Sequence, residues 1–192
     1  MIRIHERLDL AQELIKSESF RRNKGLGNEV GYYIFDYHPS QELIIRERIN
    51  YMKTKNSYGA DGFELVVFDL YDLIIDILES EDFLEQCFRF EKSRGLDHIV
   101  KVVGRLLLLN NDRNLIVQHI EEKTPEDAVV FLTGIGKCFP ILRSHKVLNN
   151  LHQSIDRVPV VLFYPGKYDG QELILFETIK DDNYYRAFKL VD

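Results

Sequence analysis

The sequence predicts an α/β fold whose mostly parallel, Rossmann-like or P-loop-like sheet is flanked by helices. Residues 129–132 and 160–163 are unbroken apolar runs, which are typical of strands buried on both faces of a parallel sheet. Between them lie a glycine turn at 134–136 and a helical pattern over 141–155. Parallel neighbours require a crossover connection, so this stretch predicts a βαβ unit.

Composition limits the chain to few classes of protein. It has 192 residues, 45% of them hydrophobic, which suits a single α/β domain over residues 1–192. Its net charge of -6 argues against broad electrostatic binding to nucleic acid or anionic lipid. Cys87 and Cys138 match no metal or redox spacing and are expected to be buried thiols. Because the chain shows no signal segment and no apolar run long enough to span a bilayer, we expect a cytoplasmic protein.

The first part of the chain predicts a helix followed by a second strand–helix–strand unit. Apolar residues at helical spacing indicate a surface helix over residues 3–17. Residues 31–37 and 63–69 are apolar and aromatic, which favours two core strands. Between them Ser40 is placed to cap a helix.

The interval between the second and third strands is long and helical. Residues 70–78 have apolar side chains on one helical face, and further helical segments are expected near 81–93, 96–109 and 112–122. A crossover needs only a dozen or so residues. We therefore expect a helical insertion at about 70–124, which offers a place for a partner to dock.

The C-terminal part predicts an antiparallel edge. The connection at 164–170 is too short to contain a crossover helix, so a strand at 173–176 should form a hairpin with the preceding strand at a sheet edge. Residues 184–190 alternate apolar and charged side chains, which favours a final strand.

Candidate functional residues follow the predicted strands, because open parallel sheets bind ligands at the carboxyl ends of their strands. Asp36 and Asp69 end two strands, and Gly134, Gly136 and Lys137 follow a third. Two carboxylates, a lysine and a glycine turn are suited to hold a metal and a phosphate. The alternative for each aspartate is a helix cap or a turn acceptor.

The known phosphate-binding patterns fail at this glycine turn. A Walker loop ending at Lys137 requires glycine at 131 and serine or threonine at 138, where the chain has Phe131 and Cys138. The dinucleotide pattern requires glycine or alanine at 139, which is Phe139. A structural turn or a protein contact is favoured over a small anionic ligand held by Lys137 and Arg143.

The helix after this turn holds further polar residues. Ser144 and His145 are adjacent and point about 100° apart, so they form no catalytic dyad. His145 and His152 are two turns apart, too distant to ligate one metal by themselves. Asn149 and Asn150 are adjacent in the same helix although asparagine is a poor helix former, which suggests that one of them bonds to a neighbouring loop or a partner.

Six segments carry distinctive motifs: GLGNEV at 25–30, YYIFDY at 32–37, FDLYDLI at 68–74, FLTGIGKCFPILRSHKVLNNL at 131–151, VPVVLFYPGKYDGQELILF at 158–176 and DDNYYRAFKLV at 181–191. In these motifs the chain resembles the BrxB family, which is defined as a domain of unknown function and is encoded in BREX bacteriophage-exclusion systems of bacteria and archaea. The helical interval at 79–124 matches only loosely.

The resemblance implies a small non-enzymatic component of an antiviral defence complex that marks host DNA by adenine methylation and blocks phage replication. It implies a PglZ-like protein as the first expected partner, with a BrxC-like ATPase and the methyltransferase as further ones. No catalytic residue is established for the family, so none is carried over to this chain, and we expect no cofactor and no metal.

Two hypotheses follow. The leading one is an adaptor that binds through the helical insertion or through the loops at 134–146 and 164–170. The candidate surface residues are Gly134, Gly136, Lys137, Arg143, His145, Asn149, Lys167 and Tyr168. The rival is a nucleotide or small-molecule sensor, or a metal-dependent enzyme, which requires Asp36 and Asp69 to approach within roughly 4 to 6 Å of each other.

Overall fold

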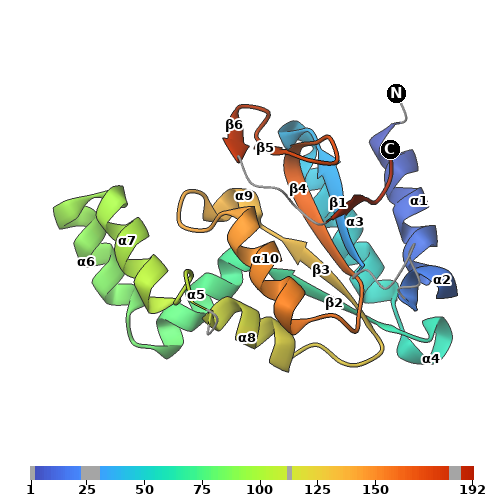
Figure 1. Ribbon diagram of the computed structural model, residues 1–192, viewed down its shortest axis with the longest axis horizontal. Coiled ribbons are helices and arrows are strands. Elements are labelled where there is room, and N and C mark those ends of the chain that lie inside the picture. Colours follow the sequence, from blue (N-terminus) through green and yellow to red (C-terminus); the bar gives the residue numbers. More distant parts are fainter. Residues whose placement is uncertain (1–2, 23–30, 112–113, 182–186) are drawn as a thin grey trace.

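The computed structural model describes residues 3–22, 31–111, 114–181 and 187–192. Within these residues seven strands form one sheet, drawn as arrows in Figure 1. They are β1 (Tyr32–Tyr37), β2 (Glu64–Asp69), β3 (Ala128–Thr133), β4 (Val160–Tyr168), β5 (Leu173–Leu175), β6 (Ile179–Asp181) and β7 (Phe188–Lys189). Strands β2, β3, β4, β1 and β7 lie in that order and pair in parallel. The predicted α/β class and mostly parallel sheet are confirmed.

The strand order places the two predicted strand–helix–strand units differently. Strands β3 and β4 are neighbours, as a βαβ unit requires. Strands β1 and β2 are not, because β4 pairs with β1 along the whole length of β1, and β3 lies between β4 and β2. This differs from the 3-2-1-4-5-6 order of the doubly wound dinucleotide-binding fold, in which the first two strands are neighbours.

Helices cover both faces of the sheet. The long ones are α1 (Ile4–Lys16), α3 (Glu42–Lys55), α5 (Leu70–Ser80), α6 (Leu84–Arg94), α7 (Leu96–Leu106), α8 (Leu115–Glu122) and α10 (Ser144–Ser154). Single turns form α2 (Glu18–Arg21), η1 (Pro39–Gln41), α4 (Tyr58–Asp61) and α9 (Ile135–Cys138). Of the described helices, none combines the length and the apolar character needed to cross a bilayer.

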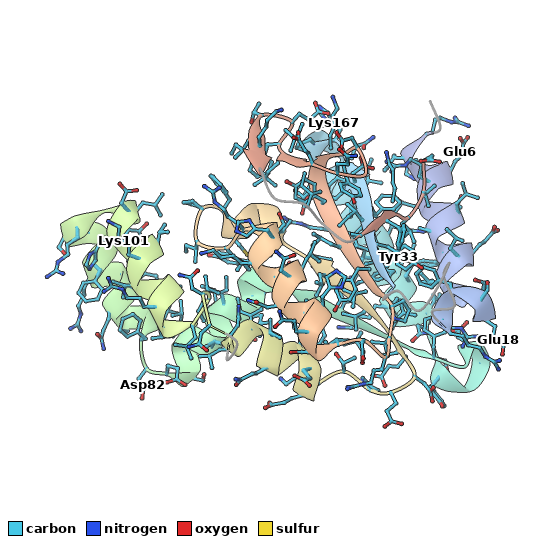
Figure 2. The ribbon with its side chains drawn as sticks, viewed as in Figure 1. Glu6, Glu18, Tyr33, Asp82, Lys101 and Lys167 are labelled. Atoms are coloured by element: carbon cyan, nitrogen blue, oxygen red, sulfur yellow. The ribbon has the colours of Figure 1, made fainter. Side chains whose placement is uncertain are left out.

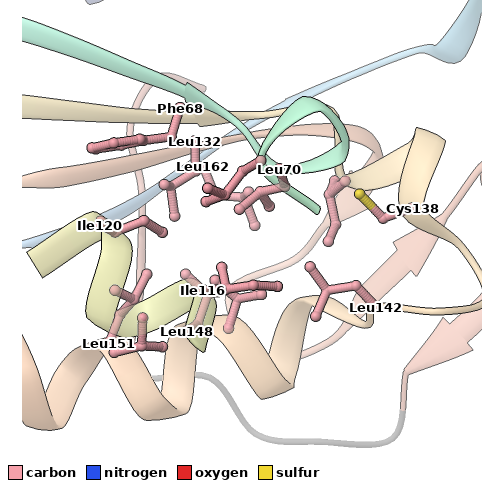
Figure 3. Close-up of a cluster of buried hydrophobic side chains, with 14 of the residues drawn as sticks. Phe68, Leu70, Ile116, Ile120, Leu132, Cys138, Leu142, Leu148, Leu151 and Leu162 are labelled. Carbon is pink, nitrogen blue, oxygen red and sulfur yellow. The ribbon is translucent and has the colours of Figure 1, made fainter. Parts of the chain in front are cut away.

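Two hydrophobic cores lie on the two faces of the sheet. Alternate strand residues point to opposite faces, so Phe131 and Phe163 pack with α1 and α3. Leu132 and Leu162 point the other way and pack with α5, α8 and α10 (Figure 3). Cys138 lies in this second core, and burial raises the pKa of its thiol to about 12. Both cysteines are buried and free, as expected from the sequence.

The helical interval between β2 and β3 has two parts. Helices α5 and α8 pack against each other and complete the core with α10. Helices α6 and α7 form a hairpin that projects away from the sheet (Figure 1), with Lys101 on α7 (Figure 2). Rings of Phe83, Phe90 and His98 pack along the hairpin, and Phe88 is 54% exposed.

Three local predictions need correction. Ser40 does not cap α3: a 3₁₀ turn precedes the helix, and His38 accepts the Ser40 N–H. The β4–β5 hairpin forms as predicted, but not at a sheet edge, because β4 is a central strand that extends beyond its neighbours before pairing with β5. The last strand contains only Phe188 and Lys189, and residues 182–186 lie outside the described part of the chain.

Candidate functional site

The carboxyl end of β2 is organised by Asp69. Its Oδ1 accepts the backbone N–H groups of Tyr71 at 3.0 Å and Asp72 at 3.3 Å, which caps α5. Its Oδ2 lies 2.7 Å from Nζ of Lys137, which also lies 3.3 Å from Asp72. The ammonium group of Lys137 is therefore held by two carboxylates at the N-terminus of α5.

The glycine turn after β3 is packed against protein at both glycines. Gly134 has a φ of +75°, and a Cβ there would lie 2.8 Å from Cγ of Asp69. A Cβ on Gly136 would lie 2.9 Å from Cγ of Pro165 and 3.0 Å from the ring of Phe176. Both residues are glycine because neighbouring side chains fill the space around the turn.

The turn between β5 and β6 carries backbone strain. Phe176 and Glu177 have φ values of +53° and +59°, although neither is glycine. The turn is fixed by hydrogen bonds from Phe176 N–H to Pro165 O at 2.8 Å and from Thr178 N–H to Leu175 O at 3.1 Å. Each such residue costs on the order of 1–3 kcal/mol, and strain of this kind concentrates at functional positions.

Side chains beside these two turns form an exposed patch, which we call the carboxyl-edge surface: Tyr71, Asp72, Lys137, Lys167, Phe176 and Glu177. Tyr71 is 40% exposed and Phe176 is 37% exposed. Lys137 lies 5.2 Å from the Tyr71 ring, and Lys167 pairs with Glu177 at 3.2 Å. Lys167 points outward at the end of the molecule that holds the β5–β6 hairpin (Figure 2). Exposed aromatics beside fixed charges are typical of protein interaction sites.

Asp36 belongs to a different, internal cluster. Its Oδ1 lies 2.7 Å from Nη2 of Arg7, and its Oδ2 lies 3.4 Å from Nζ of Lys189 and accepts the Tyr168 N–H at 3.1 Å. Asp36 is only 7% exposed. It ties the N-terminal helix, β4 and β7 to the end of β1.

The structure does not bring Asp36 and Asp69 together. Their strands are separated by β3 and β4, and three strand spacings of about 4.8 Å place them about 14 Å apart. This exceeds the separation that a shared metal ion requires. In the described residues no group of three or more histidine, cysteine, aspartate or glutamate side chains is placed to hold a metal ion.

Of the other predicted surface residues, Lys167 belongs to the carboxyl-edge surface and the rest lie outside it. Lys167 is exposed, whereas Tyr168 is 2% exposed and donates its hydroxyl to Ala187 O at 2.6 Å, so it contributes no side chain to a surface. Arg143 precedes α10, with its guanidinium 5.8 Å from the Phe139 ring. His145 is half-buried on α10, and Asn149 is exposed on the same helix.

Tyr71 and Phe176 were not expected from the sequence. Tyr71 lies on the exposed face of α5, whereas the apolar spacing of this helix predicts only which residues lie on its buried face. Phe176 reads as the last residue of a strand, and neither Phe176 nor Glu177 is a residue that predicts a left-handed turn. The only feature of the sequence that indicates a tight turn here is the short segment between β5 and β6.

Comparison with known proteins agrees with the motifs. The family described as BREX protein BrxB matches residues 66–190. A BREX protein BrxB of Bacillus cereus (strain H3081.97) is 48% identical over 192 residues, which cover 100% of both chains. A BREX protein BrxB of Escherichia coli O9:H4 (strain HS) is 30% identical over 185 residues, covering 96% of this chain and 90% of that relative. No solved structure matches. The chain belongs to the BrxB family and is a component of a BREX phage-defence system.

Proposed function

We propose that this protein is a non-catalytic adaptor that acts in the cytoplasm and joins other BREX proteins through the carboxyl-edge surface. The observation that carries the proposal is that the groups at the carboxyl ends of β2 and β3 contact other parts of the protein. Asp69 caps a helix and holds Lys137, and side chains pack against both glycines of the turn. The residues that resemble a ligand site are thus engaged in internal contacts.

The same edge presents groups suited to a protein partner. Tyr71 and Phe176 are large, partly exposed and held by a helix start and a strained turn. Rigid aromatic side chains lose little conformational entropy on binding and are frequent hot spots of interfaces. We propose a PglZ-like protein as the direct partner, and the BrxC-like ATPase and the methyltransferase as further members of the assembly that supports host DNA methylation and phage restriction.

Size-exclusion chromatography with light scattering tests the proposal. The protein is mixed with the PglZ-like protein of the same gene cluster, and a joint peak is expected. Tyr71→Ala and Phe176→Ala should each weaken the complex at least about tenfold, as hot-spot truncation does. Tyr51→Ala is the matched control, because Tyr51 is 50% exposed on α3 and lies outside the carboxyl-edge surface.

The outcomes separate the hypotheses. If Phe88→Ala disrupts the complex and the carboxyl-edge variants do not, the α6–α7 hairpin is the binding surface. If the PglZ-like protein, the BrxC-like ATPase and the methyltransferase all elute separately from this protein, the adaptor proposal fails. Titration with nucleotides and divalent metals then tests the sensor or enzyme alternative.

A further inference from the structure

One edge of the sheet is partly open. Among the described strands β2 pairs only with β3. The Glu64 N–H points toward β3, where it donates to Asp127 O at 2.9 Å. Because peptide groups alternate along a strand, Leu65 and Val67 direct their N–H and C=O groups away from β3, to the outer edge.

Asn56 closes the first part of this edge in the way that the peptide group of a neighbouring strand would. Its Oδ1 accepts the Leu65 N–H at 2.7 Å, and its Nδ2 donates to Phe63 O at 3.2 Å. Asp61 accepts from the same Nδ2 at 3.2 Å and so fixes the amide. The closure stops there: no described residue bonds the N–H of Val67, the next outward position.

A groove of about 590 Å³ lies beside the open part of the edge. It is lined by Val67 to Asp69 on β2, by α3 on one side and by α5 on the other. It continues over the carboxyl ends of β3, β4 and β1, where Thr133, Phe163 and Tyr37 line it. Helices α3 and α5 pack on opposite faces of the sheet. A strand laid beside β2 would therefore point successive side chains toward the two helices in turn.

The groove is acidic. Five carboxylates and two basic side chains line it. Glu42 pairs with Arg46, and Asp69 and Asp72 pair with Lys137, so that Asp72 belongs both to the groove and to the carboxyl-edge surface. Glu47 on α3 and Asp76 on α5 are both exposed, and neither forms an ion pair with another residue that the structure describes. Burial is the main cause that lowers the pKa of His119 below its ordinary value, so its imidazole adds no positive charge at neutral pH.

We propose that this groove binds an extended, basic segment of a partner protein, which pairs with the outer edge of β2 at Val67 as an added strand. Backbone hydrogen bonds provide the affinity in this mode of recognition, and side-chain pockets provide the specificity. A second copy of this chain is a poor occupant, because it would bring the same carboxylates to the interface. The proposal goes beyond the adaptor function above, since it holds even if the carboxyl-edge surface binds nothing.

A synthetic peptide tests the backbone pairing directly. The probe is a fluorescent hexapeptide of threonine and valine with two adjacent lysines at its centre, whose side chains point to opposite faces of a strand. We expect binding by fluorescence anisotropy at low salt. The same peptide with N-methylated backbone amides keeps its charge and loses its donors, and it should bind at least about tenfold more weakly. A peptide with glutamates in place of the lysines should not bind.

Variants of the full chain test the site. Proline is tolerated on an edge strand where its missing N–H faces away from the sheet. Val67→Pro should therefore keep the fold and weaken peptide binding at least about tenfold, whereas Val67→Thr keeps the amide and should bind like the natural chain. Glu47→Lys combined with Asp76→Lys should weaken binding at least about fivefold, an effect that salt reduces. Glu79→Lys is the matched control on α5, outside the groove.

Hydrogen exchange of the natural chain provides a measurement that needs no variant. The Val67 amide should exchange fast alone and become protected at saturating peptide, while the Phe68 amide, which faces β3, is protected in both states. Equal binding of the N-methylated peptide, unchanged exchange at Val67, or no binding up to about 1 mM would each overturn the proposal. A dimer that Val67→Pro dissociates would overturn it in favour of a second copy. The carboxyl-edge variants Tyr71→Ala and Phe176→Ala should leave peptide binding unchanged, so the two proposals can fail separately.

Discussion

The carboxyl group of Asp69 lies in the space into which a side chain at Gly134 would project. A Cβ at that position would be 2.8 Å from Cγ and 2.9 Å from Oδ2 of Asp69, and Gly134 has a φ of +75°. One carboxylate thus caps α5, holds Lys137 and excludes any residue larger than glycine from the turn after β3. This relationship explains the glycine without a bound phosphate.

Gly134→Ala should lower the free energy of unfolding by about 2–4 kcal/mol, because it adds left-handed strain and displaces the helix-capping carboxylate. Urea unfolding measures the effect. Gly170→Ala is the first control, since Gly170 has a φ of +97° and a Cβ there would meet no atom within 4 Å beyond the adjacent residues, so the substitution should cost only the strain. Gly59→Ala, in open space within α4, should be neutral or slightly stabilising. Equal losses at Gly134 and Gly170 would show that the contact with Asp69 contributes nothing.

Asp36→Ala should destabilise the protein by about 3 kcal/mol, because it leaves the guanidinium of Arg7, whose side chain is only 14% exposed, without its carboxylate. Asp36→Asn keeps an acceptor for one donor and should lose less. Asp9→Ala is the surface comparison: Asp9 pairs with Arg48 but is 61% exposed, so its loss should stay below about 1 kcal/mol. Thermal and urea unfolding measure all three variants. An Asp36→Ala variant as stable as Asp9→Ala would contradict a structural role for the cluster.

Glu177→Gly should stabilise the protein by about 0.5–1 kcal/mol, because glycine adopts the left-handed conformation of this position without strain. It removes the ion pair with Lys167, which is 66% exposed, and the contact with His38, which is 58% exposed, and such surface pairs contribute little. Thr178→Gly, in the same turn but without a positive φ, should destabilise by a similar amount. Urea midpoints compare the two, and a loss of stability in Glu177→Gly would disprove strain at this turn.

Asp61 should make stability depend on pH at the acid end. The hydrogen bond from the Ser57 backbone N–H is the main cause that holds the pKa of Asp61 below its ordinary value, and Lys16 and Asn56 add to it. A lowered folded-state pKa stabilises the protein above the unfolded-state pKa of about 3.9, and this contribution is lost as pH falls through the folded-state value.

Unfolding free energies of the natural chain and of Asp61→Asn should therefore differ at neutral pH and converge below about pH 4. Urea titrations at a series of pH values measure the difference. A difference that stays constant to the lowest pH would contradict the ionised role of Asp61. Because Asp61 also fixes the amide of Asn56, hydrogen exchange at Leu65 should accelerate in Asp61→Asn.

Local patterns in the sequence predict most of the strands, most of the helices and the parallel character of the sheet. Apolar runs such as 160–163 must be buried on both faces, and helical spacing such as that of α5 fixes one buried stripe; both are local properties of the chain. The motif at 131–151 also indicated the family to which the chain belongs. The local rule failed at Ser40, where a 3₁₀ turn competes with direct capping of the helix.

Which residues lie next to each other depends on the tertiary fold. Asp36 and Asp69 end strands that look equivalent in the sequence, yet the order β2-β3-β4-β1 separates them, and strand order depends on long-range packing that no local pattern records. The partner of Gly134 is 65 residues away along the chain. The open edge at Val67 likewise exists because β2 is the last strand of the sheet and Asn56 covers only its beginning, a property of the assembled sheet and of no single segment.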